Sequence, residues 1–186
     1  MSSFGVVLDA CVLFPAALRD TLLRAADANL YRLHWTSEIL EETRRSIVAQ
    51  QRATKEQAQK LIDQIAQYFP EAAITGHRLL VPSMTNDEGD RHVLAAAIVS
   101  NSQVIVTHNL KHFPDYALSP FNIEAQSPDK FLISLIDLAP DRMIQIIREQ
   151  TNDLSRPPAT IERVLDKFQL DAPDFVARVR AAIDSR

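Results

Sequence analysis

Short apolar runs alternate with amphipathic stretches over the N-terminal part of the chain. GVVLD (5–9) and QVIVT (103–107) are brief and almost wholly apolar, which is the pattern of buried strands. YRLHW (31–35) alternates apolar and polar positions, as a half-buried strand does. RLLVP (78–82) and FNIEA (121–125) predict two further short strands, the second at an edge of the sheet.

Helical spacing predicts the elements between these strands. Helices are expected over 17–30, from Thr36 or Ser37 onward, over 55–69, and from Asn86 or Asp87 to about Ser100. Thr and Ser are good helix caps, and acidic residues follow in the first turn, where the helix dipole favours them. Strands that alternate with helices in this way favour a parallel α/β sheet flanked by helices.

The strand patterns stop near residue 126, and helical spacing continues beyond it. Three stretches there begin with Ser or Ala followed by Pro-Asp, a common helix start, and SRPPAT (155–160) predicts a loop. We therefore expect two domains, an α/β domain over 1–125 and a helical C-terminal module over 126–186, joined at QSPD.

The composition is that of a globular protein and narrows the function only slightly. Of 186 residues, 46% are hydrophobic and 24% charged, and the net charge of −4 argues mildly against binding nucleic acid through bulk positive charge. The three glycines form no phosphate-binding loop motif. VLAAAIV (93–99) is far too short to span a membrane, and the N-terminus lacks signal-peptide features. Together with a single cysteine, Cys11, this favours a cytoplasmic protein without a membrane association.

Polar residues follow two of the predicted strands at the edge where ligands bind. Asp9 ends the apolar run GVVLD. Burying its carboxylate there costs free energy unless hydrogen bonds or an opposite charge compensate it. Asn109 lies just beyond QVIVT. Because ligands of open parallel sheets bind outside the carboxyl ends of the strands, both residues are expected at the binding edge.

Two further carboxylates border buried helix faces. On an ideal helix, Glu42 borders the apolar arc of residues 39–47, whereas the neighbouring glutamates lie nearly opposite. Asp90, Leu94 and Ala97 fall at i, i+4 and i+7, so Asp90 projects from the packed face of its helix. Clustered carboxylates repel one another, but they suit Mg²⁺, which clamps phosphate and lowers the pKa of a bound water.

These residues fall in segments that resemble the four motifs of PIN-domain nucleases, in the same order and spacing. The segments are VVLDACVLFP, SEILEETRR, NDEGDRHVLAAAI and VIVTHNLKHFP. The chain looks most like the VapC-type toxins of type II toxin–antitoxin pairs, over about residues 4–125. The helical tail also resembles an extension found in one VapC-like subgroup.

The resemblance implies a fold, an activity and partners. It implies a PIN-like parallel sheet flanked by helices and Mg²⁺- or Mn²⁺-dependent hydrolysis of RNA by a metal-activated water. Asp9, Glu42 and Asp90 would be the catalytic triad and metal ligands, with Glu42 completing the shell or orienting the water. Thr107 and Asn109 would hydrogen-bond a carboxylate or a metal-bound water. A protein antitoxin and a homodimer are the implied protein partners.

The chain departs from the family pattern at two motifs. The first motif often reads Asp-Thr-Asn, whereas this chain has Asp9-Ala10-Cys11. The fourth often ends in an acid, whereas this chain has Asn109. Because Asn109 removes one negative charge, we expect weaker binding of a second metal ion.

Structural roles remain open for the same residues. The alternatives are a cap for Asp9, a surface pair with Arg45 for Glu42, a dipole interaction for Asp90 and a turn for Asn109. For Asp87, N-capping is the favoured role. Cys11 is expected to be a small buried filler. His92, His108 and His112 do not form an H-x-x-x-H pair on one predicted helix, and they are expected to be surface or hydrogen-bonded histidines.

Basic residues near the acidic motifs give candidate RNA contacts. The candidates for phosphate binding are Arg19, Arg44, Arg45 and Arg91. The alternative is a solvated helix face, in which these cations pair with neighbouring acids.

Three functions compete at this point. The first is a metal-dependent endoribonuclease, which the resemblance identifies as a toxin neutralised by an antitoxin. The second is a haloacid-dehalogenase-like phosphatase with Asp9 as nucleophile, which needs a second acid where this chain has Cys11. The third is a non-catalytic PIN-like module that binds RNA or protein, which loss of the acids would indicate, yet all three acids are present.

Overall fold

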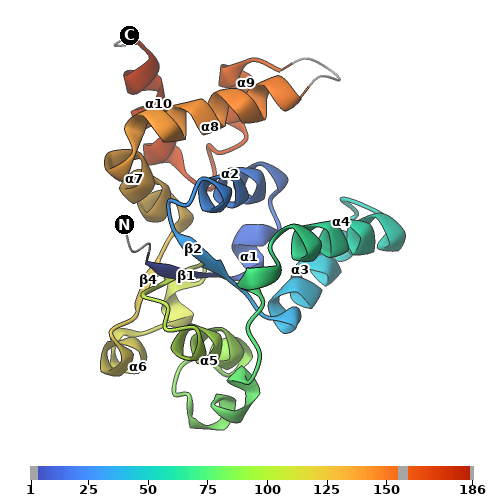
Figure 1. Ribbon diagram of the computed structural model, residues 1–186, viewed down its shortest axis with the longest axis vertical. Helices are drawn as coiled ribbons and strands as arrows, with labels where there is room; N and C mark the ends of the chain where they lie inside the picture. Colours follow the sequence, from blue (N-terminus) through green and yellow to red (C-terminus); the bar gives the residue numbers. More distant parts are fainter. Residues whose placement is uncertain (1–3, 155–158, 185–186) are drawn as a thin grey trace. The chain divides into compact units, whose positions relative to one another are not determined.

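The computed structural model describes residues 4–154 and 159–184, drawn in colour in Figure 1. Its contacts group into two compact units. The first comprises Met1–Phe14 and Tyr31–Gln126, and the second comprises Pro15–Leu30 and Ser127–Arg186. The C-terminal helices therefore share their unit with a segment from the N-terminal part of the chain. The division into domains over 1–125 and 126–186 stays a prediction.

The first unit is built on a parallel sheet. Its strands are β1 (Gly5–Leu8), β2 (Arg32–His34), β3 (Val104–Val106) and β4 (Glu124–Gln126), in the order β2-β1-β3-β4. Every pairing is parallel, with Val7 opposite both His34 and Ile105. The central strands β1 and β3 are wholly buried, as their unbroken apolar sequences require. The predicted parallel sheet is confirmed.

Helices flank this sheet, as the spacing predicts. They are α1 (Ala10–Leu13), α3 (Ser37–Ala49), α4 (Lys55–Tyr68), α5 (Arg91–Val99) and α6 (Asp115–Leu118). In Figure 1, α5 lies below the sheet, and α3 and α4 lie to its right. Thr36 caps α3, because its hydroxyl accepts a hydrogen bond from the Ile39 N–H at 3.2 Å.

The strand predicted over 78–82 is wrong. That segment forms two short 3₁₀ turns, η2 (His77–Leu79) and η3 (Val81–Ser83). Gly76 turns the chain with φ of 84°, a left-handed conformation that glycine adopts at little cost, and Pro82 has no N–H to give a neighbouring strand.

Two other boundaries differ from the predictions. The helix predicted from Asn86 or Asp87 begins as an α-helix only at Arg91, after the 3₁₀ turn η4 (Glu88–Asp90). Asp87 caps that turn by accepting a hydrogen bond from the Gly89 N–H at 3.1 Å, which is the capping role favoured for it. The edge strand predicted over 121–125 lies slightly later, in β4.

The second unit consists of helices. They are α2 (Ala16–Asp27), α7 (Pro128–Leu138), α8 (Pro140–Asp153), α9 (Ile161–Asp166) and α10 (Pro173–Asp184). As predicted, α7, α8 and α10 begin at the prolines of the three Ser/Ala-Pro-Asp sequences. Residues 155–158 of the predicted loop lie outside the described residues. None of the helices in the described part of the chain has both the length and the apolar composition needed to cross a membrane.

Polar contacts tie α2 and α10 into this unit. The Thr21 hydroxyl donates to Oε1 of Gln150 on α8 at 2.6 Å, and Nε2 of Gln150 donates to the Ala17 carbonyl at 3.0 Å. On α7, the Asp129 carboxylate accepts the first free N–H groups of α10, from Asp174 at 3.2 Å and Phe175 at 2.8 Å. An acid from one helix thus caps the start of another.

We expect Asp129→Ala to lower the free energy of unfolding by about 1–3 kcal/mol, because two N–H groups lose a charged acceptor. Urea denaturation followed by circular dichroism measures this loss. The matched control is Asp174→Ala, which removes an acid from the first turn of α10 and should cost about 0.3–1 kcal/mol through the helix dipole alone. Equal losses in the two variants would contradict the capping role of Asp129.

Candidate active site

Asp9 lies at the carboxyl end of β1, where the strand passes into α1. Asp9 is only 3% exposed, so its charge needs partners. Oδ1 accepts the Ala10 N–H at 2.6 Å, and Oδ2 accepts the Thr107 hydroxyl at 2.7 Å. Asp9 therefore caps α1 with one oxygen, as its structural alternative supposes, while the other oxygen is held from the end of β3.

Glu42 lies on the face of α3 that borders the core. Its surface alternative, a pair with Arg45, is not what the structure contains, because Arg45 approaches Glu41 instead, at 3.8 Å. The neighbour of Glu42 is His92 on α5, whose Nε2 lies 3.3 Å from Oε1 of Glu42. This is an ion-pair distance. Neither ring nitrogen of His92 forms a hydrogen bond of good geometry with any of the described residues.

The charge of His92 is governed by its acidic surroundings. Burial opposes the charged form of the imidazole, but the carboxylates of Glu42, Glu38 and Asp9 outweigh it and raise the pKa of His92 above its ordinary value. The net effect favours an imidazolium facing Glu42, which offsets part of the repulsion among the acids.

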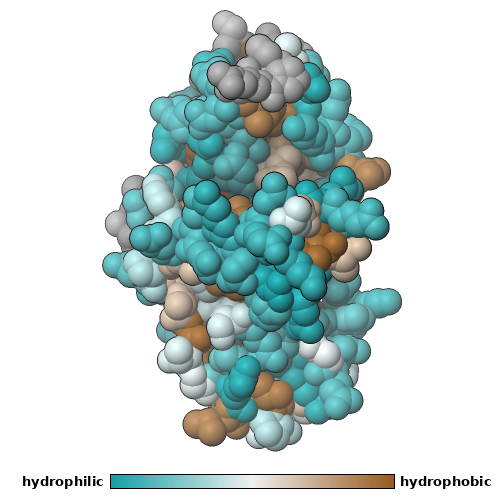
Figure 2. All heavy atoms as spheres, turned by 90° about the vertical axis from the view of Figure 1, so that its right-hand side faces the viewer, coloured by the Kyte–Doolittle hydropathy of each residue, from teal (hydrophilic) through white to brown (hydrophobic). Residues whose placement is uncertain are grey.

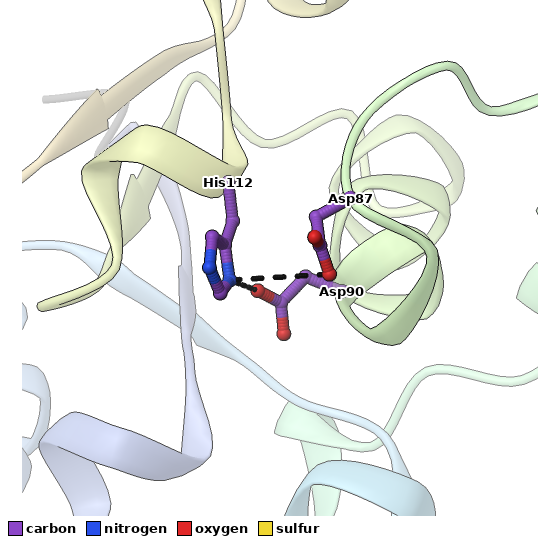
Figure 3. Close-up of side chains that lie close together, drawn as sticks. All are labelled: Asp87, Asp90 and His112. Atoms are coloured by element: carbon purple, nitrogen blue, oxygen red, sulfur yellow. Dashed lines mark hydrogen bonds and ion pairs between the residues drawn. The ribbon is translucent and has the colours of Figure 1, made fainter.

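Asp90 meets a histidine from the fourth motif. Figure 3 shows His112 pointing at Asp90, with Nδ1 2.6 Å from Oδ2 of Asp90 and 4.0 Å from Oδ1 of Asp87. Burial raises the pKa of the Asp90 carboxyl, the His112 contact lowers it, and the charges of Asp9 and Asp87 raise it further, with a net upward shift. The charge of Asp9 contributes because the two carboxylates face one region.

Thr107 and Asn109 complete the edge of the sheet after β3. Thr107 is fully buried, and its hydroxyl both donates to Asp9 and accepts the Asn109 N–H at 3.0 Å. The Asn109 side chain forms no capping hydrogen bond within the described residues. Thr107 thereby fixes Asp9 and the backbone of Asn109 at once.

One open pocket gathers most of the predicted residues. A cavity of about 440 Å³ is lined by Asp9, Glu42, Asp90 and Asn109, together with Ala10, Cys11, Arg45, Ser46 and Ala49. Carboxylate and amide oxygens are the ligands that Mg²⁺ and Mn²⁺ take in proteins, so this donor set fits a hard divalent ion. Beside it, Asp87, Asp90 and His112 have ligand atoms within 4.8 Å of one another, which could also hold a metal ion.

Cys11 contributes a protonated thiol to this pocket. Its Sγ–H donates to Oδ2 of Asp9 at 3.2 Å, and Sγ accepts the His108 N–H at 3.2 Å. Burial and the neighbouring charge of Asp9 raise the pKa of the thiol to about 12. At neutral pH, Cys11 is therefore a hydrogen-bonding filler and a poor nucleophile.

The predicted basic residues lie in different settings. Arg45 lines the pocket with a side chain that is 62% exposed. Arg44 is engaged by Glu41 through two contacts of 2.7 Å. Arg91 donates to the Asn86 carbonyl at 3.4 Å, and Arg19 lies on α2 in the second unit. Among these four residues, the structure brings only Arg45 into the pocket lining.

The groups that face the acids are not evident from the sequence. His112 is hydrogen-bonded, as expected, but its partner is Asp90. His92 is not at the surface, and it lies buried at an ion-pair distance from Glu42. The spacing of His92, two residues after Asp90, was the available signal. Nothing in the spacing indicates that residue 112 returns to residue 90.

Comparisons with known proteins agree with this geometry. A family model described as a PIN domain matches residues 5–111, and a model described as the VapC50 C-terminal domain matches residues 128–181. The chain is 41% identical over 110 residues to a Mycobacterium tuberculosis protein named "Putative ribonuclease VapC50". That match spans 59% of this chain and 65% of the relative's length. No solved structure gives a significant match.

The PIN domain model covers more than half of the chain, and it spans the strands and helices that carry the pocket acids. The resemblance seen in the four motifs is thus confirmed, and so is the resemblance of the helical tail. The chain belongs to the PIN domain family and carries a C-terminal domain of the VapC50 type.

Proposed function

We propose that the protein is a metal-dependent endoribonuclease. The observation that carries this proposal is the single pocket to which Asp9, Glu42 and Asp90 contribute, although they come from three separate segments. The name of the mycobacterial relative, "Putative ribonuclease VapC50", supports the same activity. The pKa of the Cys11 thiol, raised to about 12, does not support a cysteine nucleophile.

Asp9, Glu42 and Asp90 would hold Mg²⁺ or Mn²⁺, with Asn109 offering a carbonyl oxygen. When bound, such an ion supplies charge stabilisation for phosphate and a more acidic water. The chain's own residues prepare the donors. Thr107 holds Asp9 through its hydroxyl, and His92, 3.3 Å from Glu42, compensates part of the charge of that acid.

Removal of divalent metal should abolish RNA cleavage, and addition of Mg²⁺ or Mn²⁺ should restore it. Asp9→Asn, Glu42→Gln and Asp90→Asn should each lower the cleavage rate at least ~100-fold, because even groups that only orient metal ligands contribute about 10–100-fold. Cleavage of a labelled single-stranded RNA, with and without EDTA, measures both effects.

Glu71→Gln is the matched control, since Glu71 is an exposed acid of the same unit that lies outside the pocket lining. It should retain activity close to that of the unchanged chain. Cleavage that survives EDTA and Asp9→Asn would overturn the proposed chemistry. RNA binding without any cleavage would instead favour the non-catalytic binding module.

Arg45 is the cation best placed to meet the RNA backbone. It lines the pocket and lies 3.8 Å from Glu41, whereas Arg44 is held by Glu41 at 2.7 Å. Figure 2, which faces the right-hand side of Figure 1, shows a largely hydrophilic surface where α3 and α4 lie. A phosphate that enters the pocket can therefore pair with Arg45 without first breaking a close ion pair.

Arg45→Gln should weaken RNA binding and lower the salt dependence of binding by about 0.7 in log–log slope, the value for one phosphate of a single strand. Fluorescence anisotropy at several salt concentrations, with the Asp9→Asn chain to prevent cleavage, measures this slope. Arg44→Gln is the matched control and should change the slope less. A larger effect in Arg44→Gln would contradict the assignment to Arg45.

We also propose that the protein acts as a toxin in the cytoplasm and is neutralised by a protein antitoxin that covers the pocket. The matches to the PIN domain and VapC50 C-terminal domain models support this role. A homodimer is part of the same proposal. The acidic pocket would offer such a partner, or its basic segment, an electrostatic complement.

Induced expression of the chain in a bacterial host should arrest growth, and the Asp9→Asn chain should not. The physical reason is that only the unchanged pocket can cleave cellular RNA. Growth curves with parallel RNA gels measure the effect, and immunoblots confirm equal amounts of both chains. Equal growth with both chains, at equal expression, would contradict the toxin role.

A further inference from the structure

Asp90 is the pocket acid whose orientation depends on a side chain outside the predicted site. By position it is the N-cap residue of α5, yet within the described residues its side chain makes no capping hydrogen bond. Its Oδ2 instead meets Nδ1 of His112 at 2.6 Å. When the carboxylate is ionised it can only accept, and the Nδ1–H of His112 is then the donor. The carboxylate is thus turned away from its own helix.

The backbone around His112 fixes this donor on both sides. The Asp87 N–H donates to the His112 carbonyl at 3.2 Å, and the His112 N–H donates to the Asn109 carbonyl at 2.8 Å. The imidazole therefore stands between the turn that carries Asp87 and Asp90 and the loop that carries Asn109, as Figure 3 shows for the three side chains drawn. The backbone of His112 is thus held by main-chain contacts that do not involve the Asp90 carboxylate.

We propose that His112 is a positioning residue, which holds Oδ2 of Asp90 and thereby presents the other oxygen of this carboxylate to a divalent cation in the pocket. The inference rests on the proposed metal-dependent function and goes beyond it by naming the group that orders one of its ligands. Groups that orient metal-bound carboxylates contribute to metal affinity although they do not touch the ion.

A direct nitrogen ligand is the competing role for His112, because Asp87, Asp90 and His112 lie close enough to share an ion. The 2.6 Å contact favours positioning, since it already commits Nδ1 to the carboxylate. Asparagine tests whether the imidazole nitrogen itself is needed. Its side-chain NH₂ can take the place of the Nδ1–H of histidine and donate to Asp90, and it offers no basic nitrogen to a metal. Because an amide oxygen can also bind a hard ion, the comparison in the Asp90→Asn chain below is what separates positioning from ligation.

The test is Mn²⁺ binding to the full chain, measured by isothermal titration calorimetry without RNA. His112→Ala should weaken Mn²⁺ binding by about 10–100-fold, whereas His112→Asn should stay within about threefold of the unchanged chain. Lys111→Ala, an exposed neighbour on the same turn, is the matched control and should bind normally. Thermal unfolding of each apo chain shows whether a loss of affinity reflects loss of the fold.

A second comparison tests the route through Asp90. In an Asp90→Asn chain, His112→Ala should cause little further loss of Mn²⁺ affinity, because the carboxylate that it positions is absent. Equal weakening by His112→Ala and His112→Asn would overturn positioning in favour of nitrogen ligation. Normal Mn²⁺ binding by His112→Ala would overturn the inference alone. Failure of the unchanged chain to bind Mn²⁺ or cleave RNA would overturn the proposed function, and this inference with it.

Discussion

Repulsion among neighbouring carboxylates is the constraint on which the rest of this site depends. Asp9 is almost fully buried, and its charge contributes to the raised pKa of Asp90. Each acid has a compensating group from another part of the chain, which is Thr107 for Asp9, His112 for Asp90 and His92 for Glu42. Without such groups, burial would drive the carboxyls toward their neutral forms, which are poor donors to a cation.

The parallel sheet makes this compensation geometrically available. Because β1 and β3 are adjacent and run in the same direction, their carboxyl ends bring Asp9 beside Thr107, although 98 residues separate them. The segment after β3 then returns to the start of α5 through His112 and Asp87. The order of strands, rather than any local motif, decides which polar groups become neighbours.

Elements with a clear local periodicity could be predicted from the sequence. Apolar spacing predicts the buried strands β1 and β3, and the Pro-Asp signatures predict the starts of α7, α8 and α10. The carboxyl-edge rule and the helix faces predict that Asp9, Glu42 and Asp90 line one pocket. The strand predicted over 78–82 is wrong because a short apolar run that contains a proline is also compatible with 3₁₀ turns. The roles of His92 and His112 were missed because they arise from tertiary contacts, which no periodicity encodes. The same holds for residues 15–30, whose unit is set by packing against distant helices.

Cys11 shows how the same electrostatics shape the chemical durability of the pocket. The thiolate is the form that reacts with peroxides and disulfides, and the partly buried thiol beside Asp9 has its pKa raised to about 12. Burial is the larger cause of this rise, and the charge of Asp9 adds to it. The surroundings that hold the acids therefore also keep the cysteine in its less reactive, protonated form.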